Sequence, residues 1–170
     1  YDDPAAGRKL SSDSFAPGAW RHLFVTIDSA NQAILYVDGR QQISFSTSVR
    51  PTAISRFSIG QEWDGDTASD FFAGQIDEVQ VYNYALSNAD VTNLYTAQNT
   101  FPGAVTDLVA EYKFAGNTDD ATQFGNHATT GGAQTAKDRF GYGSNAYHFA
   151  GADSVLAANS VQLNSDYTTI

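Results

Sequence analysis

The sequence predicts an all-β sandwich of antiparallel strands with one short helix. Several short runs alternate between apolar and polar residues with a period of two, which is typical of strands with one buried face. Turn-forming residues separate these runs at regular spacing, as they do in sandwich folds. The composition is 42% hydrophobic and 13% aromatic, so the 170 residues contain enough apolar surface to fill a core.

The first half of the chain carries most of the strand signals. Residues 20–27 and 33–37 are rich in β-branched and aromatic side chains. Asp38-Gly39 separates the second run from residues 40–45 and indicates a hairpin, because both turn residues need φ > 0. Two more strands are expected at residues 56–60 and 71–82, and the second is the longest.

A short helix is expected from Ser87 to Tyr95. Ser87 and Asp90 have the spacing of a capping box, with Asp in the place of Glu. Val91, Leu94 and Tyr95 follow at helical spacing on one side. We expect this helix to pack on the edge of the sandwich.

The second half begins with a linker and returns to strands. Residues 99–107 contain Pro102-Gly103 and indicate a linker. Residues 108–114 form the next expected strand, and two short strands follow at residues 146–149 and 154–156. Tyr167-Thr-Thr-Ile170 has the pattern of the beginning of a strand.

Composition and motifs exclude several functions. The chain has 19 acidic and 9 basic residues and a net charge of -10, so it lacks the basic field that nucleic acids require. The absence of Cys excludes disulfides, thiolate zinc sites and cysteine nucleophiles. No apolar run approaches the roughly 18 residues that indicate a membrane helix. The three His residues lack metal-ligand spacing, and no nucleophile elbow, phosphate loop or dinucleotide fingerprint is present.

Three groups of segments together resemble the LamG-like jelly-roll modules, a branch of the concanavalin A-like lectins and glucanases. The first group is residues 20–28 with Leu-Tyr-Val-Asp-Gly at 35–39, and the second is Phe-Ala-Gly-Gln-Ile-Asp-Glu-Val-Gln-Val-Tyr-Asn-Tyr-Ala-Leu-Ser at 72–87. The third starts with Leu-Val-Ala-Glu-Tyr-Lys-Phe-Ala-Gly-Asn at 108–117 and continues to residue 151. The resemblance implies a jelly-roll β-sandwich.

The order of these segments departs from that of the family, whose modules open on the third group and close on the second. We therefore interpret residues 1–98 as the C-terminal part of one module, 99–107 as a linker and 108–170 as the N-terminal part of a module. Three arrangements remain open. The halves close on each other as in a circular permutation, the head of one chain completes the tail of the next, or the chain is an excerpt of a tandem array.

The resemblance also implies a structural Ca²⁺ site. Related sandwiches hold one Ca²⁺ through an Asp of the closing strand and main-chain carbonyls. The corresponding positions here are Asp77, Gly151 and approximately Lys113, the last through its carbonyl. Ca²⁺ binds several hard oxygen ligands, carbonyls included, so this set is chemically reasonable. The alternative is that Asp77 is an exposed or strand-capping carboxylate.

The segment Glu62-Trp-Asp-Gly-Asp66 is the second candidate site. Its two leading carboxylates resemble the pair of laminarinase-type glycoside hydrolases, but those enzymes need the acid and nucleophile on a regular strand. Gly65 interrupts the pattern, and the context indicates a loop. We expect Trp63, Asp64 and Asp66 to form a loop that binds Ca²⁺ or contacts a ligand, with Trp63 stacking on a sugar, or a solvated acidic loop over which Trp63 packs.

The resemblance favours a module without catalytic residues, in a repetitive secreted or cell-surface protein. The expected function is adhesion or binding of a glycan or another cell-surface ligand. The expected partner is an adjacent module or a neighbouring copy, with no insertion into membranes. The competing function is structural, as a filament subunit assembled head-to-tail, and a glycoside hydrolase is the third alternative. Fold alone does not fix function.

Overall fold

The structure is a computed structural model that describes residues 2–3, 7–8, 14–48, 56–96, 107–158, 160–163 and 168–169. The chain forms two compact units, each assembled from segments that are distant in the sequence. Unit 1 consists of Tyr1–Thr52, Tyr82–Asp107 and Ser165–Ile170, and unit 2 consists of Ala53–Val81 and Leu108–Asn164.

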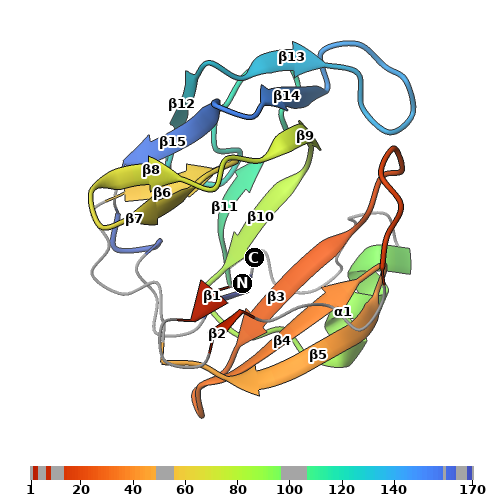
Figure 1. The fold of residues 1–170 in the computed structure, drawn as a ribbon, viewed down its shortest axis with the longest axis vertical. Coiled ribbons are helices and arrows are strands. Elements are labelled where there is room, and N and C mark those ends of the chain that lie inside the picture. Colours follow the sequence, from red (N-terminus) through yellow and green to blue (C-terminus); the bar gives the residue numbers. More distant parts are fainter. Residues whose placement is uncertain are drawn as a thin grey trace. The chain divides into compact units, whose positions relative to one another are not determined.

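Antiparallel strands are the main secondary structure of both units (Figure 1). The strands of unit 1 are β1 (Asp2–Asp3), β2 (Gly7–Arg8), β3 (Leu23–Ile27), β4 (Gln32–Val37), β5 (Arg40–Ser46) and β16 (Thr168–Thr169). The strands of unit 2 are β6 (Arg56–Ile59), β7 (Glu62–Asp64), β8 (Thr67–Ser69), β9 (Ala73–Ile76), β11 (Leu108–Tyr112), β12 (Ala128–Gly131), β13 (Gln134–Ala136), β14 (Ala146–Ala150) and β15 (Ser154–Ala158). Strand β10 (Val79–Tyr82) begins in unit 2 and ends in unit 1.

The sheet of unit 1 is built around the predicted hairpin. Its strands follow the order β16-β3-β4-β5, and Tyr82 at the end of β10 pairs with Thr169 of β16. Asp38 and Gly39 connect β4 to β5 with φ of 51° and 73°. The hairpin prediction is therefore confirmed, and its turn has the left-handed backbone that this residue pair favours.

The predicted helix is α1 (Asn88–Thr96), the one helix among the described residues. The Ser87 hydroxyl accepts the Asp90 amide at 3.2 Å, and the Asp90 carboxylate accepts the Ser87 amide at 3.0 Å, so the capping box is confirmed. Val91 and Leu94 are fully buried, whereas Tyr95 is 43% exposed. No helix among the described residues is long and apolar enough to cross a membrane.

Unit 2 holds two three-stranded sheets, a hairpin and one core. The sheets follow the orders β12-β15-β6 and β13-β14-β9, β7 pairs with β8, and β10 lies beside β11. Its buried residues form a single hydrophobic cluster with four fully buried or nearly buried aromatic rings. Those rings belong to Tyr112, Phe114, Tyr147 and Phe149.

One strand prediction is wrong. Residues 71–82 do not form a single strand, because Asp77 and Glu78 separate β9 from β10. Glu78 has a φ of 51°, which takes the backbone out of the extended region and ends the run of pairing. Arg139 donates a hydrogen bond to the Glu78 carboxylate at this bend. Asp77 therefore lies at a break in the strand.

Unit 2 joins segments from both halves of the chain. Strand β9 pairs with β14 from Ala73↔Ala150 to Ile76↔Tyr147, and β6 pairs with β15 from Arg56↔Ala158 to Ile59↔Val155. The strand that pairs with Gln75 is thus β14, which belongs to the second half of the sequence. Of the predicted linker at residues 99–107, only Asp107 lies among the described residues.

Gly39→Ala tests the contact between the hairpin and the helix. A Cβ at position 39 would lie 2.8 Å from Cδ1 of Tyr95, and the left-handed backbone adds strain. We expect the free energy of unfolding, measured by urea denaturation, to fall by more than the roughly 1–2 kcal/mol of a left-handed residue. Gly18→Ala is the matched control, because Gly18 has a φ of 85° in unit 1 and an added methyl would meet nothing within 4 Å. If Gly39→Ala and Gly18→Ala lower the free energy of unfolding equally, the close contact between Gly39 and Tyr95 adds nothing to the cost of the substitution.

Candidate functional site

An open hollow of about 510 Å³ lies in unit 1, beside the β4–β5 turn and α1. Three segments of the chain contribute its walls: the residues before β3, the turn and start of β5, and the last two turns of α1. The lining residues are Phe15, Arg21, Val37, Asp38, Gly39, Arg40, Gln42, Thr92, Tyr95 and Thr96. The hollow is a shallow surface depression that is open to solvent and not an enclosed cavity.

Asp38 connects two of these segments. Its Oδ2 accepts a hydrogen bond from Nη1 of Arg21 at 2.8 Å, and its Oδ1 accepts the His22 amide at 3.0 Å. The Asp38 amide in turn donates to the His22 carbonyl at 2.8 Å. Partial burial raises the pKa of Asp38, but the His22 amide and Arg21 outweigh it, so this pKa lies below its usual range. Asp38 is therefore a positioning carboxylate whose charge is already balanced.

Two aromatic side chains are available in the hollow. Phe15 is 38% exposed and Tyr95 is 43% exposed. The guanidinium carbon of Arg21 lies 5.2 Å from the centre of the Phe15 ring, within the range of a cation–π contact. Tyr95 contacts the His22 ring at 5.6 Å between centroids and packs closely on Gly39. Both rings are held by neighbours while part of each remains accessible.

The Glu62–Asp66 segment is the first strand and the turn of the β7–β8 hairpin and not the predicted loop. Glu62–Asp64 forms β7 and pairs with β8, with Trp63 opposite Ala68. Because side chains alternate along a strand, Trp63 points to the opposite face from Glu62 and Asp64. The indole Nε1 donates to the Ser58 hydroxyl at 3.0 Å, and Glu62 accepts the Ser69 hydroxyl at 2.8 Å. The structure thus separates Trp63 from Asp64, and Asp66 lies in the turn that follows.

Asp77 is a half-buried carboxylate at the break between β9 and β10. Its Oδ1 is buried and has no hydrogen-bond partner among the described residues. Burial, and then the charge of Glu78, raise the pKa of Asp77 to about 6. An orphaned carboxylate oxygen of this kind is suited to a cation.

The other two predicted calcium ligands are placed differently. Gly151 follows Ala150, which pairs with Ala73 at the far end of β9, so Gly151 and Asp77 are separated by about five residues, or about 16 Å. Oxygens that share one Ca²⁺ lie about 5 Å apart or less. Lys113 directly follows β11, the neighbour of β10. Asp77 offers one unpartnered carboxylate oxygen, Gly151 lies too far along the strand to share a cation with it, and no three His, Asp or Glu side chains gather as a metal site in the described part of the chain.

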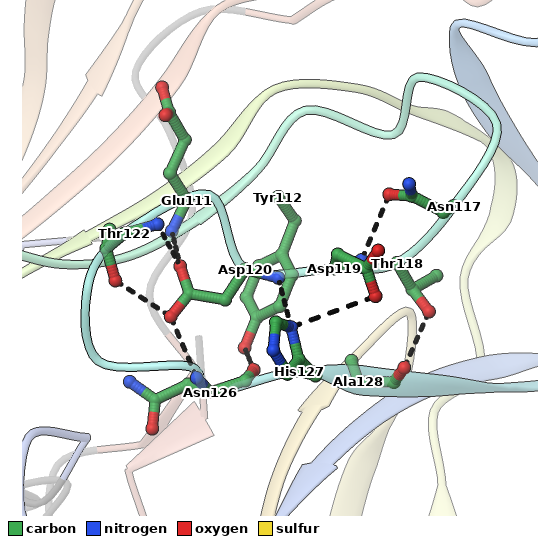
Figure 2. Close-up of polar contacts among 10 residues, drawn as sticks. All are labelled: Glu111, Tyr112, Asn117, Thr118, Asp119, Asp120, Thr122, Asn126, His127 and Ala128. Carbon is green, nitrogen blue, oxygen red and sulfur yellow. Dashed lines mark hydrogen bonds and ion pairs between the residues drawn. The ribbon is translucent and has the colours of Figure 1, made fainter.

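Asp120 is the centre of a buried polar network (Figure 2). Its Oδ1 accepts the amides of Glu111 and Thr122, both at 2.9 Å, and its Oδ2 accepts the Thr122 hydroxyl and the Asn126 amide. Burial raises the pKa of Asp120, but these hydrogen bonds outweigh it and hold the pKa below its usual range. The carboxylate has no oxygen left for a substrate or a metal, so its role is structural.

The network extends through Asn126 and His127. Nδ2 of Asn126 donates to the Val109 carbonyl at 2.8 Å, and the Tyr112 hydroxyl donates to the Asn126 carbonyl at 2.7 Å. Nδ1 of His127 accepts the Asp120 amide at 3.2 Å and lies 3.7 Å from Asp119 (Figure 2). These contacts fasten residues 117–128 onto β11.

The sequence signals indicate some of these groups and miss others. The segment with Asp120, Asn126 and His127 has the pattern of a turn with ordinary carboxylates, because pattern alone does not show that Asp120 is buried. The hollow was not predicted at all, since Phe15, Arg40 and Tyr95 are far apart in the sequence and share no motif.

Residues 3–92 match the family described as the Concanavalin A-like lectin/glucanases superfamily. The matched stretch is just over half of the 170 residues. The chain belongs to this family. No curated protein and no solved structure matches it.

Family membership confirms the fold class that the sequence predicted. The chain is a LamG-like module with the antiparallel β-sandwich of the concanavalin A-like class and one helix among the described residues. The match covers the first two groups of segments and ends before the third. All residues that line the hollow fall within it except Tyr95 and Thr96.

Asp120→Asn tests the buried network. Both carboxylate oxygens accept N–H donors, so the amide nitrogen of Asn would meet a donor in either orientation. We expect the free energy of unfolding at pH 7 to fall by about 2 kcal/mol or more, measured by urea denaturation. Asp119→Asn is the control, because the Asp119 side chain is 64% exposed, and its effect should stay within about 0.5 kcal/mol.

Wild type and Asp120→Asn also test how the contribution of Asp120 to stability depends on pH. Because the pKa of Asp120 is lowered in the fold, its ionised form stabilises the protein above the unfolded pKa of about 3.9, and this contribution is lost as the pH falls. The difference between wild type and Asp120→Asn should therefore shrink below about pH 4. A difference that stays constant down to about pH 2 would contradict the assignment.

Proposed function

We propose that this LamG-like chain is a non-catalytic module that binds a saccharide in the hollow of unit 1. The observation that carries the proposal is a concave surface with two partly exposed aromatic rings, Phe15 and Tyr95, beside charged and polar side chains. Aromatic rings offer an apolar face to the C–H face of a sugar, and the polar groups offer partners to its hydroxyls.

The carboxylates near the hollow support binding rather than hydrolysis. A glycosidase places two carboxyl groups about 5–9.5 Å apart on either side of the scissile bond. One carboxylate, Asp38, lines the hollow, and Arg21 and His22 already hold it. Glu62 and Asp64 share one face of strand β7, as a hydrolytic pair would, but they belong to the exposed β7–β8 hairpin of unit 2 and do not line the hollow.

A saccharide-binding module of this family is suited to a secreted or cell-surface protein. There it would serve adhesion, with a glycan as ligand and an adjacent module or a neighbouring copy as partner. The net charge of -10 makes a nucleic-acid partner unfavourable.

Substitutions in the hollow test saccharide binding. We expect the wild-type chain to bind members of a glycan array, and Phe15→Ala and Tyr95→Ala each to weaken binding of the best glycan about tenfold, or about 1.4 kcal/mol, by calorimetry. Circular dichroism and the melting temperature establish that each variant is folded. Phe15→Ala is the safer variant, because Tyr95 also packs on Gly39 and His22.

Trp63→Ala is the matched control, since it removes an aromatic side chain from the β7–β8 hairpin of unit 2. It should leave the affinity unchanged. Binding that survives both hollow variants but is lost in Trp63→Ala would move the site to the hairpin. A chain that binds no glycan on the array would overturn the function.

We also propose a structural Ca²⁺ at Asp77, with main-chain carbonyls such as that of Lys113 as further ligands. The support is the buried Oδ1 of Asp77, which lacks a hydrogen-bond partner among the described residues. A bound cation would neutralise this half-buried charge. Gly151 has no part in this version of the site, given its position at the far end of β9.

Calcium should raise the melting temperature of the wild type and not that of Asp77→Asn. At a free Ca²⁺ concentration 100 times the dissociation constant, binding raises the free energy of unfolding by about 2.7 kcal/mol. In chelator the variant should melt above the wild type, because it lacks the half-buried charge. Asp64→Asn, which changes an exposed carboxylate, should respond to Ca²⁺ as the wild type does. A wild type whose melting temperature is the same in Ca²⁺ and in chelator would exclude the site.

The second candidate function is a structural one, as a filament subunit assembled head-to-tail. Its support is the pairing of β9 with β14 and of β6 with β15, which joins segments on either side of residues 97–106. A second copy could supply the same strands to its neighbour. Scattering that remains that of a compact monomer at every concentration would exclude this alternative.

A further inference from the structure

We propose that the ligand of the hollow is an acidic saccharide, and that the guanidinium of Arg40 binds its carboxylate. This inference rests on the proposed saccharide function and adds the chemical class of the ligand. Three features of the hollow carry it: the charges that line it, the way its walls are held and the number of cations that it offers.

The sign of the charge in the hollow is opposite to that of the whole chain. The chain carries a net charge of -10, with 9 basic and 19 acidic residues. Arg21, Arg40 and Asp38 are the charged residues of the lining, which gives the hollow one net positive charge. An anionic ligand is therefore attracted to this surface while the rest of the protein repels it.

The two arginines have different roles. Arg21 is bound to Asp38 at 2.8 Å and lies over the ring of Phe15, so its charge is balanced and its side chain is committed to the wall. Arg40 is exposed, and no carboxylate pairs with it among the described residues. Arg40 is thus the cation that the hollow can offer to a ligand.

The backbone at Arg40 is fixed by the turn before it. Asp38 and Gly39 adopt left-handed φ values, and Tyr95 packs against Gly39. Arg40 and Val37 then form the first pair of the β4–β5 ladder. The turn and the strand pairing therefore set the position from which the Arg40 side chain extends.

The remaining lining residues suit the hydroxyls and the ring of a sugar. The Thr92 hydroxyl donates to the Asn88 carbonyl at 2.8 Å, and the Thr96 hydroxyl donates to the Thr92 carbonyl at 2.9 Å. A hydroxyl that donates one hydrogen bond can still accept others, so both oxygens can receive hydrogen bonds from a sugar. Phe15 and Tyr95 provide the apolar faces.

A single available guanidinium favours a monoanion with planar geometry. Arginine binds a carboxylate through two parallel N–H···O hydrogen bonds, and one such pair balances one charge. A phosphate dianion would need a second cation, and Arg21 is already occupied by Asp38. A uronic-acid unit satisfies both requirements, because it carries one carboxylate on each sugar ring.

The test compares uronic-acid tetrasaccharides of galacturonate, glucuronate and mannuronate with the same sugars after reduction of their carboxylates to alcohols. Calorimetry on the whole chain should show that at least one uronate binds about ten times or more tightly than its reduced form. Raising the NaCl concentration from about 50 to about 500 mM should weaken the uronate and leave the reduced sugar unchanged.

Variants assign the effect to Arg40. Arg40→Gln should lose the tenfold preference for the uronate while it still binds the reduced sugar, and Arg40→Lys should keep part of the preference, because it keeps the charge without the planar fork. Lys137→Gln removes the same charge from an exposed position in unit 2 and should behave as the wild type does.

The outcomes separate the two proposals. Equal binding of a uronate and its reduced form, still weakened by Phe15→Ala, would overturn the acidic ligand and leave the saccharide function intact. A tetrasaccharide of neutral sugars that carries sulfate groups is the last probe. If it binds as tightly as the best uronate, and Arg40→Gln weakens that binding, the preference for carboxylate is overturned. A chain that binds neither the uronates nor any neutral glycan would overturn both proposals.

Discussion

The carboxylate of Asp38 is the interaction on which the hollow of unit 1 depends. It occupies a left-handed turn position, accepts the His22 amide and binds Arg21, which in turn lies over Phe15. The next residue, Gly39, is in close contact with Tyr95 of the helix. One turn therefore fixes three segments of the chain relative to one another, and the proposed saccharide site is the surface that these segments leave open.

In unit 2, Asp120 has the same kind of role as Asp38 has in unit 1. Its two oxygens accept hydrogen bonds from β11, from its own turn and from Asn126, which places residues 117–128 against the core (Figure 2). Asp38 and Asp120 are both acidic, and both have pKa values below the usual range. In each case the donors around the carboxylate explain the shift, so neither is a candidate for acid–base catalysis. Asp77 differs, because one of its oxygens is buried without a partner among the described residues.

The reversed order of the family segments is reflected in how the strands of unit 2 pair. Strands on both sides of residues 97–106 pair within unit 2, so neither half of the sequence builds this unit alone. An isolated half would expose unpaired strand edges and apolar faces, which is unfavourable in water. The module is therefore stable only when its sheets are completed. Because the missing strands can come from the same chain or from another copy, completion of the sheets also decides how the module assembles.

Local signals in the sequence determined the elements whose causes are local. Asp38-Gly39 predicted the hairpin, Ser87 with Asp90 predicted the start of the helix, and alternation with family motifs predicted the sandwich. They did not predict the break at Glu78 or the hairpin at Glu62–Asp64, because a left-handed Glu and the pairing of short polar strands depend on surrounding contacts. The burial of Asp120, the distance between Asp77 and Gly151 and the meeting of Phe15, Arg40 and Tyr95 were decided by the tertiary structure alone. Each of these features depends on contacts between residues that are distant in sequence. Sequence patterns report only the conformational preferences of residues that are close along the chain.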